Sequence, residues 1–171
     1  DAGFSMAQLA ARAEVTPATP YNLIGGKSEL LRLVIEDEYE RFAEKLAGQP
    51  ARAPLAALLA ATALVVTHYE TDRQFYRGLY RMIVTTEGSE TYDLMALRGE
   101  RLWGDMVSAC VESGELQGFV RIGPLTRALL TTIASLTTAW FAQEWSARRY
   151  GLEMAHGVRL VLASVANAPL R

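Results

Sequence analysis

A chain of 171 residues, half of them apolar, is long enough to bury a sizeable hydrophobic core. Its formal net charge of −2 argues against a protein that coats nucleic acid through bulk positive charge. A reader of one DNA sequence stays possible, because it needs only a few local phosphate contacts. Cys110 is the single cysteine, so no internal disulfide can form. The uncharged run 128–143 is too short to span a bilayer, so we expect a cytoplasmic protein with no membrane partner.

The stretch 5–31 predicts two short helices joined by a tight turn, followed by the start of a longer helix. Ser5 and Gln8 have the spacing of a capping box, in which each side chain bonds the backbone N–H of the other residue. An apolar face follows at helical spacing, made by Met6, Leu9 and Ala13.

The second short helix has clear start and stop signals. Thr16 is a good N-cap, and Pro17 suits the first helical position because its missing N–H costs nothing there. Gly25-Gly26 ends the helix, since glycine accepts a left-handed backbone. The outward face is small and polar, as expected for a helix that enters a DNA major groove. It consists of Thr16, Pro17, Thr19 and Asn22.

In order and spacing, this stretch resembles the DNA-binding half of the TetR family of transcriptional regulators. The matching residues are Leu9-Ala10, Val15-Thr16, Thr19, Tyr21, Lys27, Glu29, Leu30 and Leu31, with Ile24 where the family usually has Phe. The resemblance implies that the partner is a palindromic double-stranded DNA operator. It also implies the DNA-binding residues: Thr19 and Asn22 at bases or sugar–phosphate, Tyr21 and Lys27 at phosphates, Pro17 on the same face, and Thr16 as the backbone cap.

Two residues depart from the family's pattern. Glu14 stands where Gly is usual, and a non-Gly residue in a left-handed turn costs on the order of 1 kcal/mol. Pro20 stands where Leu is usual and is expected to distort the start of the second helix. The family's first helix is missing before Ser5, so we expect a longer native chain. That segment would supply positive charge, of which 1–31 has little.

After the predicted helix-turn-helix stretch 5–31, the spacing of apolar residues predicts further helices and no strand. A connecting helix at 27–46 turns its acids, 36–38 and 40, toward solvent. Further helices are expected at 54–70, from Asp72 to Gly88-Ser89, at 90–113, at 124–150 and, after a break at Gly151, at 152–167. The predicted fold is all-α, with a helix-turn-helix DNA-binding domain at 1–46 and a helical-bundle effector-binding and dimerisation domain at 47–171.

Aromatic and Met residues are abundant in the helices between 55 and 113. They pack a core, or they line a cavity for a small apolar or aromatic effector. The sequence alone does not distinguish core packing from a ligand cavity, and the resemblance favours the cavity. Arg73 is a candidate partner for an acidic ligand. The candidate pocket residues are His68, Tyr69, Phe75, Tyr76, Tyr80, Trp103, Met106 and Trp140.

The last predicted helix is apolar almost all round, and the helix before it has a surface of small residues. A helix that is apolar all round must be covered on both sides, and a second copy of the chain is the expected cover. The sequence therefore predicts a homodimer. The candidate interface residues are Leu129, Ile133, Leu136, Val158, Val161 and Val165.

No enzymatic constellation is visible in the sequence. It has no glycine-rich phosphate loop, no nucleophile elbow and no His-Glu-x-x-His motif, and His68 and His156 lie far apart. We therefore expect no catalytic residue, no metal and no cofactor. The predicted function is that of a DNA-binding regulator, a repressor released by its effector. An all-α enzyme or a lipid or small-molecule carrier with a chance helix-turn-helix resemblance is the alternative.

Overall fold

The computed structural model describes the backbone of residues 5–85 and 89–168 and the side chains of 5–83 and 97–168. In these ranges the chain is all-helical, as predicted, with eight helices and no strand. The helices are α1 (Met6–Arg12), α2 (Ala18–Ile24), α3 (Lys27–Ala47), α4 (Pro54–Glu70), α5 (Arg73–Thr85), α6 (Ser89–Glu112), α7 (Ile122–Gln143) and α8 (Ala147–Ala163). Within the same residues, no helix combines the length and apolar character that a membrane crossing needs.

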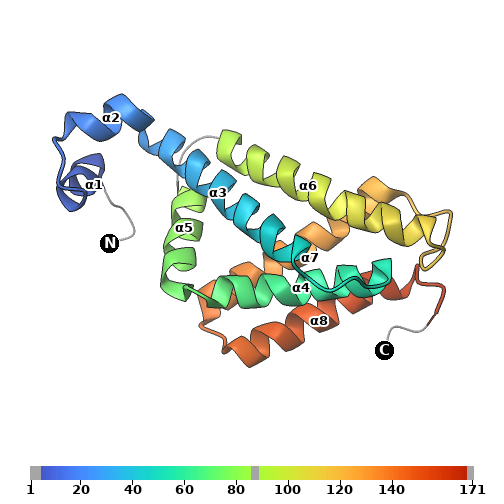
Figure 1. The fold of residues 1–171 in the computed structure, drawn as a ribbon. Coiled ribbons are helices and arrows are strands. Elements are labelled where there is room, and N and C mark those ends of the chain that lie inside the picture. The colour runs from blue at the N-terminus through green and yellow to red at the C-terminus, as the bar shows by residue number, and fades with distance from the viewer. Residues whose placement is uncertain (1–4, 86–88, 169–171) are drawn as a thin grey trace.

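Helices α1 and α2 form a small unit at one end of the molecule, beyond the main bundle (Figure 1). The predicted capping box is present: the Gln8 N–H donates to Ser5 Oγ over 3.1 Å, and the Ser5 N–H donates to Gln8 Oε1 over 2.7 Å. The turn passes through Glu14, whose φ of 55° is left-handed, so this non-glycine residue carries the strain expected of it. Met6 and Ala10 are buried on α1, which packs against α2.

The start of α2 differs from the prediction. The helix begins at Ala18, and the Thr16 hydroxyl lies 2.8 Å from the Thr19 hydroxyl, not on a backbone N–H. The expectation that Thr16 caps the backbone of this helix is therefore wrong. Pro20 is buried and lies in the first turn, where no residue needs an intrahelical N–H bond. The proline is consequently accommodated with only a delayed helix start.

Helix α3 connects the α1–α2 unit to the rest of the molecule (Figure 1). It begins after Gly25, whose φ of 91° produces the sharp change of direction that only glycine adopts readily. Leu31 is buried near the N-terminal end of α3, whereas Ile35 and Phe42 are buried farther along the helix. Helix α3 packs against α4 and α6 in the bundle and follows α2 directly in the chain.

The main bundle is built from α4, α6, α7 and α8, with α5 crossing at one end (Figure 1). Helix α4 has the predicted bounds, and Asp72 caps α5, since its carboxylate accepts the Phe75 N–H over 2.9 Å. Trp140 and Tyr150 are fully buried at the centre, with ring centroids 4.7 Å apart and planes 7° apart. The predicted break at Gly88-Ser89 lies partly outside the described residues.

The boundary between the last two helices was predicted wrongly. Helix α7 ends at Gln143, because Glu144 adopts a left-handed backbone with φ of 52°. Ser146 then caps α8 by accepting the Arg149 N–H, so Gly151 lies inside a helix and does not break one. The uninterrupted apolar spacing hid this turn. Helix α8 therefore begins five residues earlier than predicted, at 147 and not at 152.

Helices α7 and α8 approach closely at Gly157. A Cβ atom there would lie 2.9 Å from both Leu136 Cδ1 and Thr132 Cγ2. Gly157→Ala is expected to lower the free energy of unfolding by about 1 kcal/mol, because overpacking outweighs the gain in helix propensity. Gly78→Ala in α5 is the control, since a Cβ there meets no atom within 4 Å, and it should stabilise by about 0.5–1 kcal/mol. Equal stabilisation of both variants in urea unfolding would contradict the close crossing.

Candidate ligand cavity and DNA-reading helix

The side chains predicted to meet DNA lie on or beside α2. Thr16, Pro17, Tyr21 and Asn22 are exposed, with Tyr21 57% accessible, and Thr19 and Lys27 are partly exposed. Few charges surround them. Arg32, on the next turn of α3, pairs with Glu29 at 2.6 Å and Glu36 at 2.7 Å. The predicted DNA-facing residues of α2 therefore carry little positive charge, and the helix also exposes the large apolar side chain of Leu23, 78% accessible.

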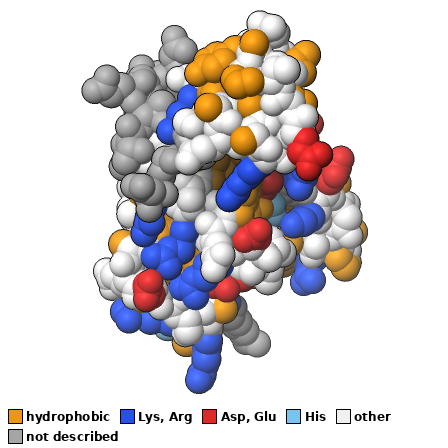
Figure 2. Space-filling model, turned by 90° about the vertical axis from the view of Figure 1, so that its left-hand side faces the viewer, with side chains coloured by type: hydrophobic (Ala, Val, Ile, Leu, Met, Phe, Trp, Pro, Cys, Tyr) orange, Lys and Arg blue, Asp and Glu red, His pale blue; other side chains and the backbone are white. Residues whose placement is uncertain are grey.

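A cavity of about 200 Å³ lies between α3, α4, α5, α6 and α7. Figure 2 views the molecule from the side of α1 and α5 and shows a recess with hydrophobic side chains inside it. Most of the wall is apolar or aromatic. Among the residues predicted for the pocket, those that line it are His68, Tyr69, Tyr76, Tyr80 and Trp103.

The other predicted pocket residues lie elsewhere. Phe75 is 41% exposed, Met106 packs against the core, and Trp140 stacks on Tyr150. Arg73 also lies outside the lining: its guanidinium donates to the Trp145 carbonyl and sits over the Trp140 ring, 4.9 Å from its centroid.

Helix α3 contributes a part of the wall that the sequence analysis missed. Ile35, Glu38, Tyr39 and Phe42 all line the cavity. The expectation that acids 36–38 face solvent is wrong for Glu38, whose side chain is only 14% exposed. The sequence did carry a signal that Glu38 is turned inward. It lies three residues after Ile35 and four before Phe42, which places it on the same helical face as these apolar residues.

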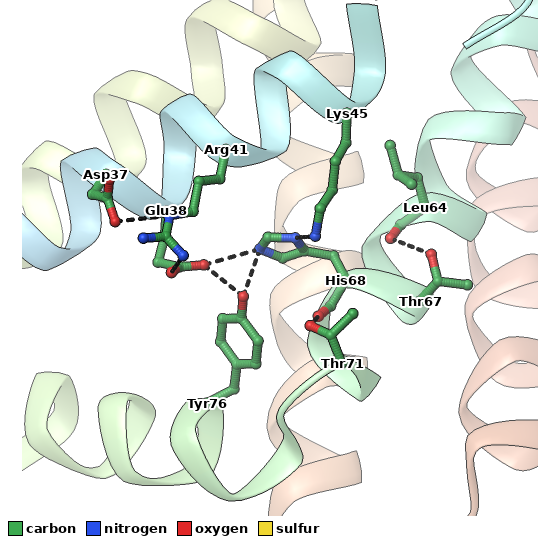
Figure 3. A network of polar contacts seen from close by, with 9 residues as sticks. All are labelled: Asp37, Glu38, Arg41, Lys45, Leu64, Thr67, His68, Thr71 and Tyr76. Carbon is green, nitrogen blue, oxygen red and sulfur yellow. Dashed lines mark hydrogen bonds and ion pairs between the residues drawn. The ribbon is translucent and has the colours of Figure 1, made fainter. Parts of the chain in front are cut away.

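A polar cluster at this wall joins three helices (Figure 3). The Tyr76 hydroxyl from α5 donates to Glu38 Oε2 over 2.5 Å, and it lies 3.0 Å from His68 Nε2. His68 Nε2, from α4, is 3.3 Å from the same carboxylate oxygen. Lys45 Nζ lies 3.0 Å from His68 Nδ1 on the far side of the ring. Glu38, His68 and Tyr76 therefore hold α3, α4 and α5 together.

These contacts determine the protonation of His68. An ammonium group can only donate, so Nδ1 must accept from Lys45 and the proton of the neutral ring is on Nε2, facing Glu38 and Tyr76. Burial lowers the pKa of His68 and the Lys45 charge lowers it further, while Glu38 opposes them. The ring is therefore neutral at physiological pH.

The phenols of Tyr69 and Tyr76 remain protonated at neutral pH. Burial, followed by the charge of Glu38, raises the pKa of Tyr69 to about 12, and burial and Glu38 also raise the pKa of Tyr76. The Tyr80 hydroxyl lies 2.7 Å from Thr138 Oγ1. The cavity thus offers a carboxylate and several neutral hydroxyls against an apolar background.

The predicted interface residues fall into two groups. Leu129, Ile133 and Val158 are buried in the core of the single chain, and Ile133 also lines the cavity. They are not available for contact with a second copy. Leu136, Val161 and Val165 are partly buried and pack against that core.

Acid is expected to destabilise the fold through His68. Its folded pKa lies below the ordinary value, so the unfolded chain binds more protons once the pH falls below about 6.5. The contribution of His68 to the free energy of unfolding is therefore fully present above that pH and decreases below it. His68→Gln cannot take up this proton and should lose less stability between about pH 7.5 and 5.5 in urea titrations. Parallel losses in both proteins would contradict a neutral His68.

Comparison with known proteins gives a structural likeness alone. No protein-family model and no curated protein sequence matches the chain. Among solved structures, the chain is similar to the ketosteroid transcriptional regulator KstR2 of Mycobacterium tuberculosis, with a TM-score of 0.54 and 14% sequence identity. The likeness covers 96% of this chain and 86% of the other. At this identity it concerns the fold, and it supports the TetR-like arrangement of helices that the sequence predicted.

Proposed function

We propose that this protein is a sequence-specific DNA-binding transcriptional regulator that represses its target and is released by a small, mostly apolar ligand. One observation carries the proposal: α3 begins directly after α2 and forms one wall of the cavity. A ligand that contacts Ile35, Glu38 or Phe42 therefore touches the helix that carries the reading unit. The match in fold to a transcriptional regulator is consistent with this function.

The size of the regulatory effect is bounded by thermodynamics. A ligand shifts DNA affinity only through its different affinities for two positions of α3, typically by about 1–3 kcal/mol. DNA must weaken ligand binding by the same factor. The cluster of Glu38, His68 and Tyr76 is the natural element to hold one of these positions, because it joins α3 to both α4 and α5.

A homodimer completes the proposal. Two copies of the α1–α2 unit, about one turn of the DNA helix apart, would match the two half-sites of a palindromic operator. The outward faces of α7 and α8 suit such an interface. On α8, Leu152 and Leu160 are 55% and 74% exposed. On α7, Ala128, Thr131 and Ser135 are exposed and small, which permits close helix approach. Obligate interfaces of this kind often bury about 2,000 Å² or more.

DNA binding through α2 is tested by selecting operators from a random DNA library with the full-length protein. Asn22→Ala should change the preferred sequence. Lys27→Ala should weaken all sequences similarly and reduce the slope of log affinity against log salt by about one. If no salt-dependent, sequence-selective binding is found in competition titrations, the regulator proposal fails and a small-molecule carrier becomes the better reading of the cavity.

The dimer is tested by sedimentation at micromolar concentration. Leu160→Glu should shift the protein toward monomer, because it places an unpaired charge in the proposed interface while leaving the core intact. Gln74→Glu, exposed in the first turn of α5 and outside α7 and α8, adds the same charge as a control. A wild-type monomer would rule the arrangement out.

Ligand control is tested by filling the cavity. Leu79→Trp adds a large side chain at a lining position and should abolish the ligand response while operator binding persists. The measurement is operator affinity with and without a bound effector. A variant that keeps the full response would show that the effector binds elsewhere.

A further inference from the structure

The charge of the cavity wall selects among possible ligands. Glu38 is the single carboxylate among the described lining residues, and none of those residues is Lys or Arg. The segment 84–96, whose side chains are not described, contains no Lys or Arg either. Arg73, the sequence-predicted partner for an acid, lies outside the lining, where it donates to the Trp145 carbonyl and sits over the Trp140 ring. The described lining therefore lacks a cation to neutralise an anionic ligand.

The carboxylate itself is only partly neutralised. Both short contacts, from Tyr76 and His68, are to Oε2. The cation nearest Oε1 among the described residues is Arg41, whose Nη1 is 3.9 Å away. Arg41 has a 61% exposed side chain and makes its closer contact, 2.9 Å, with Asp37. Lys45 is separated from Glu38 by the His68 ring. A nearly buried carboxylate whose single ion pair to a described Lys or Arg is a long one, with an exposed Arg41 that also pairs with Asp37, favours a further cation placed beside it.

Aromatic faces complete the environment that a cation prefers. The Tyr69 and Tyr76 rings meet edge to face with centroids 4.9 Å apart, next to Glu38 on the same wall. Tyr80 stacks on Phe141 at 5.3 Å and continues the aromatic lining. Aromatic faces attract ammonium groups, most strongly where water is excluded, and they also accept the apolar body of the same molecule.

We propose that the ligand of this cavity is a lipophilic monocation, a protonated or quaternary amine on an aromatic or alicyclic body, with its charge beside Glu38 Oε1. The inference rests on the proposed function, because it names the class of effector for the same cavity. Acidic ligands are excluded by the like charge of Glu38. Neutral ligands of the same shape bind more weakly, since they leave the carboxylate with the long Arg41 pair alone.

The test uses three probes with one apolar body and different charge: phenylbutylamine, phenylbutanol and phenylbutyrate. Calorimetric titration of the full chain at neutral pH should show the amine binding about tenfold more tightly than the alcohol, and the carboxylate binding most weakly. Glu38→Gln keeps the shape of the side chain and removes its charge. It should abolish the advantage of the amine while changing alcohol binding by less than about threefold.

Glu40→Gln is the matched control, because it removes an equal charge from an exposed position of α3 outside the cavity lining. It should leave the ranking of the probes unchanged. Unchanged alcohol binding by Glu38→Gln reports that the variant keeps the cavity folded. Equal binding of amine and carboxylate, persistence of the amine's advantage in Glu38→Gln, or failure of all three probes to bind would overturn the proposal.

Operator binding, measured in parallel, separates this inference from the proposed function. Selective amine binding by a protein that selects no operator would retain the ligand class and refute the regulator. Operator selection without amine selectivity would retain the regulator and refute the ligand class.

Discussion

The contact on which the arrangement depends is the meeting of the Glu38 carboxylate with the Tyr76 hydroxyl and the His68 ring. It ties α3, which carries the α1–α2 unit, to α4 and α5 in the bundle. A nearly buried carboxylate is costly unless it accepts hydrogen bonds, so this contact favours one position of α3 over others. The tautomer of His68 follows from it, because Lys45 occupies the other ring nitrogen.

The cavity combines two roles that usually conflict. A polar cluster stabilises the unliganded bundle, and the same carboxylate faces the space that a ligand would fill. A ligand charge beside Oε1 would couple binding to helix position, because it would act on the carboxylate whose Oε2 accepts the Tyr76 hydrogen bond. Coupling of this kind requires two arrangements of one packed element. Helix α3 is the element placed for it, because it follows α2 in the chain and lines the cavity.

At its centre, away from the cavity, the core is closely packed. Trp140 and Tyr150 stack at the centre, and the Tyr150 hydroxyl finds Thr137 Oγ1 at 2.7 Å. Gly157 lets α7 and α8 approach closely. A closely packed scaffold of this kind leaves the cavity walls few alternative positions, so a change at α3 is not absorbed by the bundle.

The sequence by itself determined the all-α class, the capping box at Ser5, the glycine stop before α3 and the bounds of α4, because these depend on local backbone chemistry and apolar spacing. It misplaced the α7–α8 boundary, since the left-handed Glu144 and the Ser146 cap interrupt no apolar pattern. It also placed Glu38 in solvent and Phe75 and Trp140 in the pocket. Only the tertiary structure decided these positions, because the space that faces a helix is defined by the angles at which the other helices cross it, and those angles are not local.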